Sequence, residues 1–191
     1  AAVEEQVRAA FDVDKLFAPK GEDAAPMEGW SNLQARVQAY LREIEDTQSV
    51  SLHIRRGDYL TPENQALFGG ICTEAYYKEA MRRMREQYPG CRFFLFTNDK
   101  EWAKMRFVDR PSTDVTVVDL PEGCDHQEFA LMSKCKHNIL ANSSYSWWAS
   151  YLNINPHKTV LAPSKWLNGW DCRDVYREDM QKVTVAGQDD K

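Results

Sequence analysis

Hydrophobic residues follow two different spacings along the chain. Short runs that are apolar almost throughout, such as residues 92–97 (RFFLFT), predict strands that are buried on both faces. Stretches with apolar residues three or four positions apart, such as residues 32–44, predict helices with one buried face. The expected strands are residues 50–54, 92–97, 115–119, 138–141 and 159–162. The expected helices are residues 4–11, 32–44, 74–88, 126–136 and 146–152, and a further one that starts at Lys100.

Strands and helices alternate from residue 49 onward, and this order predicts the fold class. We expect an α/β fold, with a Rossmann-like parallel sheet and helices on both of its faces. This domain is expected at residues 49–185, after a helical and linker segment at residues 1–48 and before a polar tail at residues 186–191. Within the first segment, Pro19-Lys20-Gly21 and Pro26 interrupt any helix.

The composition limits the classes of protein to consider. The chain has 191 residues, of which 43% are hydrophobic and 28% charged, as in a globular domain with a core. A net charge of −5 argues against general nucleic-acid binding. No apolar run approaches the roughly 20 residues that cross a bilayer, so no transmembrane segment is expected in this chain. Five cysteines without a CxxC pair are interpreted as mostly reduced, structural thiols.

Polar clusters follow three of the expected strands, at the edge where ligands bind in an open α/β sheet. Arg55-Arg56-Gly57-Asp58 follows the first strand, Thr97-Asn98-Asp99 follows the second, and Asn142-Ser143-Ser144 follows the fourth and opens a helix. Planar guanidiniums suit a phosphate or diphosphate, which accepts paired hydrogen bonds. The free N–H groups at a helix start also attract anions. Together the clusters predict a pocket for a phosphate-bearing ligand.

Each cluster also has a simpler interpretation. Arg55 and Arg56 could be surface charges paired with Asp58, and Arg56-Gly57-Asp58 spells an adhesion tripeptide. The segment Asn142-Ser143-Ser144 matches both a glycosylation sequon and a plain helix cap. Asp99 is either a helix cap or a ligand contact, and His53 is either a core histidine or a residue that orients the arginine loop. Packing is favoured over substrate stacking for Trp147 and Trp148. For Trp166 and Trp170, packing and stacking are equally open.

Other nucleotide and metal motifs are missing from the sequence or poorly placed. Asp12-Val13-Asp14 resembles the DxD metal motif of nucleotide-sugar enzymes, but it follows no apolar strand and is interpreted as a solvated loop. His126, His137 and His157 lack the spacing of metal ligands, so no metal site is expected. The chain contains neither GxGxxG nor GxxxxGK[ST], which argues against a dinucleotide oxidoreductase and a P-loop NTPase.

Three sequence blocks resemble the ordered motifs of a known enzyme family. They are SLHIRRGDYL, RFFLFTNDKEW and FALMSKCKHNILANSSYSWWASYLN, the last followed by NPHKTVLAPSKW. They span about residues 49–166 and are similar to those of the α-1,2-fucosyltransferases, glycosyltransferase family 11. The resemblance implies a GT-B enzyme that transfers fucose with inversion from GDP-fucose to the 2-hydroxyl of a galactoside. It implies a galactose-terminated oligosaccharide or glycolipid as acceptor, and no required metal or other cofactor.

The resemblance also implies roles for individual residues. By motif position, Arg55 would grip the donor diphosphate, with Arg56 and Asp58 shaping the same loop. His53 occupies a donor-site position of the wider superfamily, and Asp99 belongs to the second cluster at the same edge. Asn142, Ser143 and Ser144 would face the phosphates from the opposite side, while Glu128, where Asp is usual, would accept hydrogen bonds from the guanine edge.

The general base and the acceptor cleft are less defined. Asp58 and Glu63 are the nearby carboxylates that could remove the acceptor proton, and a base in another domain is the alternative. The family's glycine-rich GGLGNQMFQ-like block is missing, so we expect this chain to be the donor-binding half and residues 1–48 to connect to an N-terminal domain.

Alternatives to a family 11 transferase remain open. They are a non-catalytic sugar-nucleotide or glycan-binding module, a protein O-fucosyltransferase and a phosphotransferase without a P-loop. The expected location is the cytoplasm, peripheral to the inner membrane, with the Golgi lumen as the alternative.

Overall fold

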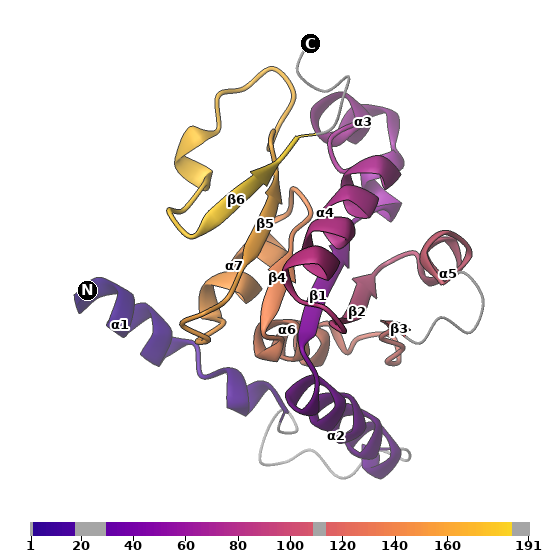
Figure 1. Ribbon diagram of the computed structural model, residues 1–191, viewed down its shortest axis with the longest axis vertical. Coiled ribbons are helices and arrows are strands. Elements are labelled where there is room, and N and C mark those ends of the chain that lie inside the picture. The colour runs from indigo at the N-terminus through magenta and orange to yellow at the C-terminus, as the bar shows by residue number, and fades with distance from the viewer. Residues whose placement is uncertain (1, 18–29, 109–113, 185–191) are drawn as a thin grey trace.

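Six parallel strands form one sheet, and its topology confirms the predicted α/β, Rossmann-like class. The computed structural model describes residues 2–17, 30–108 and 114–184, so the prolines of residues 18–29 and the polar tail lie outside the described residues. The strand order is β3-β2-β1-β4-β5-β6 (Figure 1). The strands are β1 (Ser49–Ile54), β2 (Arg92–Thr97), β3 (Val115–Val117), β4 (His137–Ile139), β5 (Val160–Pro163) and β6 (Met180–Val183).

Helices connect the strands and begin close to where the sequence places them. The α-helices are α1 (Ala2–Ala10), α2 (Trp30–Asp46), α3 (Pro62–Phe68), α4 (Glu74–Gln87), α5 (Lys100–Phe107), α6 (Asp125–Lys134) and α7 (Ser144–Leu152). The 3-10 helices are η1 (Val13–Phe17), η2 (Gly57–Leu60) and η3 (Arg173–Val175). The predicted DxD loop therefore runs into η1, where Asp14 pairs with Lys134 at 2.5 Å.

Besides the short 3-10 helices, the sequence prediction missed one α-helix and one strand. Helix α3 has only seven residues, and Thr61 caps it while Pro62 occupies its first turn. Strand β6 (MQKV) has no apolar run, because it lies at the sheet edge with exposed side chains at Gln181 and Lys182. Smaller errors concern element ends: helix α6 ends at Lys134 rather than residue 136, and β4 covers residues 137–139 rather than 138–141. At the ends of short strands, buried residues continue beyond the last hydrogen-bonded pair. The length of the apolar run therefore overestimates the length of the strand.

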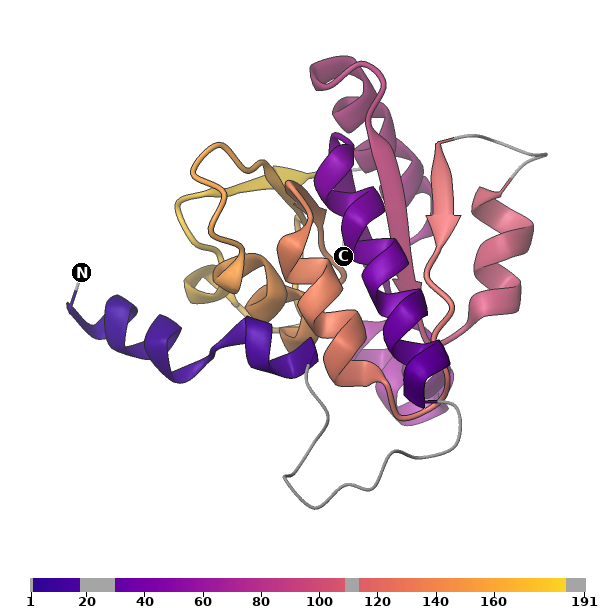
Figure 2. The ribbon, with the colours of Figure 1, turned by 90° about the horizontal axis from the view of Figure 1, so that it is seen from below.

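The core consists of two layers, one on each face of the sheet. Along β2, Phe93 and Leu95 pack with α4, whereas Phe94 and Phe96 pack on the other side. This second layer includes residues of α2, α6 and α7. Helix α4 crosses one face in Figure 1, and Figure 2 shows α2 and α6 side by side. Burial on both faces explains why β2 is apolar almost throughout.

The sheet reverses its winding between β1 and β4. From β1 the chain continues to β2 and β3 on one side, and β4, β5 and β6 extend the sheet on the other. Strands β1 and β4 pair in parallel, with Leu52 opposite Ile139. A crevice forms at such a reversal because the connections leave the two strands in opposite directions, and ligands of open α/β sheets bind there, beyond the carboxyl ends.

A buried amide network holds β1, β4, α6 and α7 together beneath this crevice. The Asn138 side chain is fully buried, and its Nδ2 donates to Ser51 Oγ at 2.7 Å and to the Met132 carbonyl at 3.1 Å. Asn153 Nδ2 donates to Asn138 Oδ1 at 2.8 Å and to the Cys135 carbonyl at 2.7 Å. These bonds satisfy polar groups that burial would otherwise penalise, so they fix the register of the switch-point strands.

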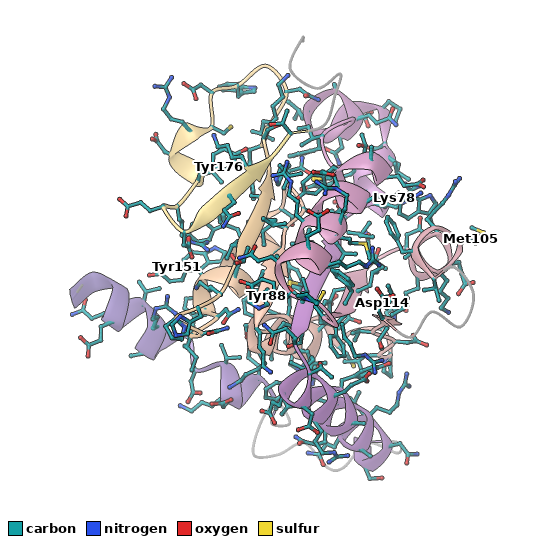
Figure 3. The ribbon with its side chains drawn as sticks, in the orientation of Figure 1. Lys78, Tyr88, Met105, Asp114, Tyr151 and Tyr176 are labelled. Atoms are coloured by element: carbon teal, nitrogen blue, oxygen red, sulfur yellow. The ribbon has the colours of Figure 1, made fainter. Side chains whose placement is uncertain are left out.

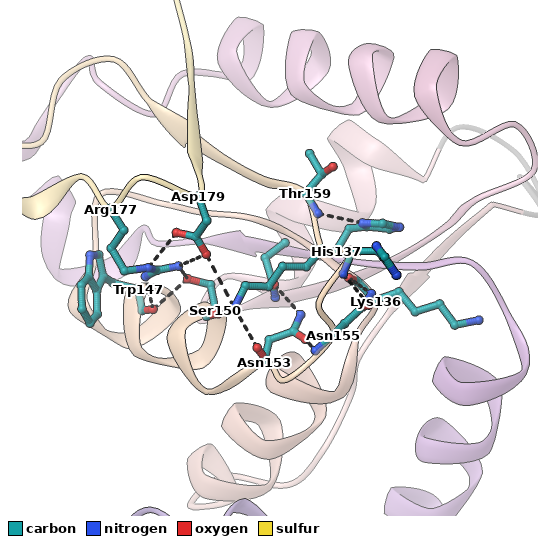
Figure 4. Close-up of polar contacts among 12 residues, drawn as sticks. Lys136, His137, Trp147, Ser150, Asn153, Asn155, Thr159, Arg177 and Asp179 are labelled. Carbon is teal, nitrogen blue, oxygen red and sulfur yellow. Dashed lines mark hydrogen bonds and ion pairs between the residues drawn. The ribbon is translucent and has the colours of Figure 1, made fainter. Parts of the chain in front are cut away.

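Two cations hold the carboxyl end of α7. Lys158 Nζ donates to the carbonyls of Ser150 at 2.9 Å and Asn153 at 2.7 Å. Arg177 donates to Ser150 Oγ and to the Trp147 carbonyl, and it pairs with Asp179 (Figure 4). Positive groups at this end satisfy the free carbonyls and complement the helix dipole. The opposite end of α7 is thereby held in position at the crevice.

Candidate functional site

The two arginines after β1 lie in different surroundings. Arg55 Nη2 is 2.9 Å from Asp58 Oδ2, and both side chains are more than a third exposed. Arg56 Nε is 3.0 Å from Asp99 Oδ2, and its guanidinium lies 3.9 Å from the centre of the Trp102 ring. Arg56 is therefore held by the β2–α5 connection. Arg55 has contacts within its own loop, with Asp58 and with the Tyr59 ring at 5.7 Å, and its side chain stays 36% exposed.

Gly57 makes this loop geometrically possible. Its φ is +49°, a left-handed conformation that side-chain-bearing residues rarely adopt. A Cβ at this position would lie 2.5 Å from Asn98 Nδ2. Asn98 Oδ1 accepts from the Arg56 backbone N–H at 2.9 Å. The glycine thus lets the loop after β1 lie directly against the loop after β2.

Asp99 combines two roles at the start of α5. Its Oδ1 accepts from the Trp102 backbone N–H at 3.2 Å, as a helix cap, and its Oδ2 accepts from Arg56 Nε. Both oxygens are engaged within the protein. The geometry therefore gives Asp99 a supporting contact with the arginine loop.

Tyr59 and Asn142 join the loops after β1 and β4. The Tyr59 hydroxyl donates to the Asn142 carbonyl at 3.0 Å. Asn142 is 2% exposed, and its Nδ2 donates to the carbonyls of Trp166 at 3.1 Å and Phe68 at 3.5 Å. The Asn142 side chain is therefore turned into the fold. Sequence reasoning did not single out Tyr59 or Trp102; the only signal was their proximity to the polar clusters.

Ser143 and Ser144 form the amino end of α7. Ser143 is the N-cap, and its Oγ accepts from the Tyr145 backbone N–H at 3.4 Å. Ser144 is exposed in the first turn. The helix-cap interpretation of this segment is confirmed. Because a helix start also carries free N–H groups and partial positive charge, the same geometry can bind an anion.

His53 lies beneath the arginine loop with an unsatisfied nitrogen. Its side chain is 4% exposed, and Nδ1 has no hydrogen-bond partner among the described residues. Its ring centre is 5.3 Å from that of Tyr145 in α7. Burial, assisted by the charge of Arg55, lowers its pKa to about 3. The imidazole is therefore neutral, and it can offer one N–H to a ligand.

Glu128 lies in the first turn of α6. Its carboxylate is 15% exposed and lies 4.0 Å from Lys100 Nζ. Burial raises its pKa to about 7, with Lys100 opposing the shift and Asp125 and Asp119 adding to it. A half-ionised, largely buried carboxylate is typical of a functional site.

The two candidate bases differ in their surroundings. Asp58 accepts from Arg55, and its backbone carbonyl accepts from Asn64 Nδ2 at 2.9 Å. Glu63 is exposed in the first turn of α3. A cavity of about 200 Å³ adjoins this loop, with Arg55, Arg56 and Trp102 in its lining.

Within residues 2–17, 30–108 and 114–184, no three His, Cys, Asp or Glu side chains are grouped to hold a metal ion. In the same ranges, the helices are too short or too polar to span a bilayer.

The sequence model described as "Glycosyl transferase family 11" matches residues 30–181. The chain belongs to glycosyltransferase family 11. Over 127 residues it is 39% identical to the "O-antigen biosynthesis glycosyltransferase WbnK" of Escherichia coli, which covers 65% of this chain and 41% of that protein. It is 36% identical over 133 residues to an "Alpha-1,2-colitosyltransferase" of Escherichia coli, covering 67% of this chain and 46% of the relative.

A human relative extends the comparison beyond bacteria. The family 11 chain is 35% identical over 104 residues to the human "Galactoside alpha-(1,2)-fucosyltransferase 1", covering 54% of this chain and 28% of that protein. The chain thus aligns with less than half the length of each of these relatives. No solved structure matches it.

Proposed function

We propose that this chain holds the donor-binding site of an inverting galactoside α-1,2-fucosyltransferase that uses GDP-fucose. The observation that carries the proposal is the convergence of Arg55, His53 and the α7 amino end at the switch point between β1 and β4. These three elements offer a guanidinium, one neutral N–H donor and several backbone N–H donors to a diphosphate. The names of the relatives support a fucose-like donor and a galactoside acceptor.

In this proposal each site residue has a defined contact. Arg55 and the N–H groups near Ser143 and Ser144 bind the diphosphate, and His53 donates from Nδ1. Arg56, Asp99 and Asn142 hold the three loops in position. Glu128 accepts hydrogen bonds from N1 and N2 of guanine, because an ionised carboxylate offers two acceptors to that edge.

The chemistry follows from where charge develops. As the bond from the fucose anomeric carbon to GDP breaks, the sugar becomes positive and the departing diphosphate gains negative charge. Preorganised donors stabilise that charge without reorganisation, so Arg55 and the α7 start supply the main electrostatic assistance, and the proposal needs no metal. Asp58 braces Arg55, and Glu63, exposed at the start of α3, is the better placed carboxylate to take the acceptor proton.

The acceptor and the cellular location form a further part of the proposal. We take the acceptor to be a galactose-terminated oligosaccharide or glycolipid, at the cytoplasmic side of the inner membrane, because two relatives bear bacterial O-antigen and colitosyl names. A sugar-nucleotide-binding module without transferase activity would use the same pocket. A fucose-transfer assay with GDP-fucose and lactose separates the two functions.

Calorimetry with GDP tests the donor site directly. Arg55→Ala is expected to weaken GDP binding by about 2–4 kcal/mol, because it removes a charge-assisted contact to the diphosphate. Arg82→Ala is the matched control, since Arg82 is also ion-paired and exposed but lies in α4, paired with Glu79. An Arg55→Ala affinity equal to that of the control would refute the donor site.

A further inference from the structure

A second cavity lies at the carboxyl edge of the sheet, beside β5 and β6. Its volume is about 460 Å³, and the β5–β6 connection supplies most of its walls. Its lining combines aromatic rings with charged groups: Trp166, Trp170, Tyr176, Lys165, Arg173 and Lys182. None of these residues belongs to the donor site described above. Pockets that recognise small polar ligands combine aromatic walls with a few charged groups in this way.

The aromatic walls of the cavity are braced. The Trp166 and Tyr176 rings meet edge to face, with centres 6.1 Å apart and an angle of 87°. The Tyr176 hydroxyl donates to the Pro163 carbonyl at 2.9 Å, and Lys182 Nζ lies 3.8 Å from the centre of the same ring. Figure 3 shows Tyr176 in this connection, beside strand β6. The ring positions are therefore set before any ligand binds.

Trp170 is the exception, because it is 70% exposed. Asp171 and Arg173 follow it and pair with each other, Arg173 Nε donating to Asp171 Oδ2 at 2.7 Å. Hydration of a large apolar ring is unfavourable, and an exposed tryptophan flanked by charges resembles the rigid aromatic anchors of binding surfaces.

This cavity is tied directly to the donor site. Asn142, whose carbonyl accepts from Tyr59, donates its side-chain amide to the Trp166 carbonyl at 3.1 Å. Asn168 donates to the carbonyls of Leu67 and Gly69, each at 2.9 Å. The β5–β6 connection is thus joined to both α3 and the loop after β4. A ligand in the cavity would lie on the same edge of the sheet as a bound GDP-sugar.

We infer that this cavity is an acceptor subsite that binds the galactoside, with Trp170 as its stacking platform. The inference rests on the proposed function, whose acceptor it places. One face of a galactose ring consists of C–H groups, which pack well on the negative face of an indole. The remaining hydroxyls can accept from Arg173 and Lys182 and donate to Asp171.

Titration with lactose, followed by saturation-transfer NMR, tests the subsite on the 191-residue chain. Trp170→Ala is expected to raise the lactose Kd about tenfold or more, as for an aromatic anchor, and to leave the GDP Kd within about twofold. Trp148→Ala is the control, because Trp148 is 38% exposed but lies on α7 against Phe11. The exposure of Trp170 makes its replacement compatible with folding.

Three results would overturn the subsite: no saturable lactose binding by the unmodified chain, an unchanged lactose Kd in Trp170→Ala, or an equal loss in Trp148→Ala. A loss of GDP affinity alone in Trp170→Ala would instead make this ring a nucleobase platform. Failure of the donor proposal is a separate outcome: the unmodified chain would bind lactose in a Trp170-dependent manner and would not bind GDP.

Discussion

At the scale of single residues, the arginine loop depends on contacts that a motif does not reveal. Arg55 and Arg56 are adjacent in sequence, yet one pairs with Asp58 in the same loop and the other with Asp99 after β2. We therefore propose that Arg55, rather than both guanidiniums, contacts the anion. Arg56 acts by holding the loop, through an ion pair and the Trp102 ring.

Gly57→Ala tests that loop geometry. A Cβ imposes left-handed strain and meets Asn98, so we expect a loss of about 1–3 kcal/mol in the free energy of unfolding, and weaker GDP binding. Gly90→Ala is the control, because Gly90 has φ +79° but no atom within 4 Å of the added Cβ. Urea denaturation of both variants gives the comparison. Equal losses in the two would show that the contact with Asn98 has no structural role.

Glu128 gives the donor site a predicted pH dependence. Its pKa is raised to about 7 by burial, so the carboxylate becomes ionised as the pH rises through neutrality. If the ionised form accepts from guanine, GDP affinity should increase from pH 6 to pH 8, and Glu128→Gln should flatten that increase. Calorimetry at pH 6 and pH 8 measures the GDP affinity of the unmodified chain and of Glu128→Gln. Titration of GDP itself affects both proteins equally, so the difference between them reports on Glu128. Parallel pH profiles would exclude Glu128 from the guanine contact.

At the scale of elements, α7 links the site to the core. Its amino end carries Ser143 and Ser144 at the crevice, and its other end is capped by Lys158. At this capped end, Asn153 and Asn138 connect the helix to β4, and Ser51 continues the network into β1. The two strands that flank the crevice are thus aligned by side-chain bonds as well as by the ladder.

Asn138→Ala should therefore destabilise the fold. The substitution leaves Ser51 Oγ and Asn153 Nδ2 without this buried partner, and we expect a loss of about 2–4 kcal/mol in the free energy of unfolding. Gln181→Ala, at an exposed position of β6, should change it by less than about 0.5 kcal/mol. Urea denaturation measures both variants. A loss in Asn138→Ala as small as in the control would mean that the network does not stabilise the switch point.

At the scale of the whole molecule, buried histidines link stability to pH. His137 is 2% exposed and stacks on Tyr88, and its Nδ1 accepts from the Thr159 backbone N–H at 3.0 Å. Burial, with a smaller effect of Lys136, lowers its pKa to about 4. Between about pH 6.5 and pH 4 the unfolded chain binds the proton and the folded chain does not, so the histidine makes acidification destabilising.

Denaturation of His137→Gln at pH 7 and pH 5 isolates this effect. The unmodified chain should lose more stability on acidification than the variant, by on the order of 1–3 kcal/mol. His157→Gln, at an exposed position, should retain the original difference. The comparison between variants is needed because the raised pKa of Glu128 makes acidification stabilising, which opposes the effect of His137. An unchanged difference in His137→Gln would contradict the assignment.

The sequence determined the α/β class, the first five strands and the family, because buried parallel strands and contiguous motifs are local patterns. It also identified the polar residues at the strand ends, whose roles remain predictions. Tertiary structure alone decided what depends on distant partners: the pairing of Arg56 with Asp99, the inward turn of Asn142, and the edge strand β6 with its polar sequence. Such contacts join segments tens of residues apart, and hydrophobic spacing carries no information about which polar groups meet.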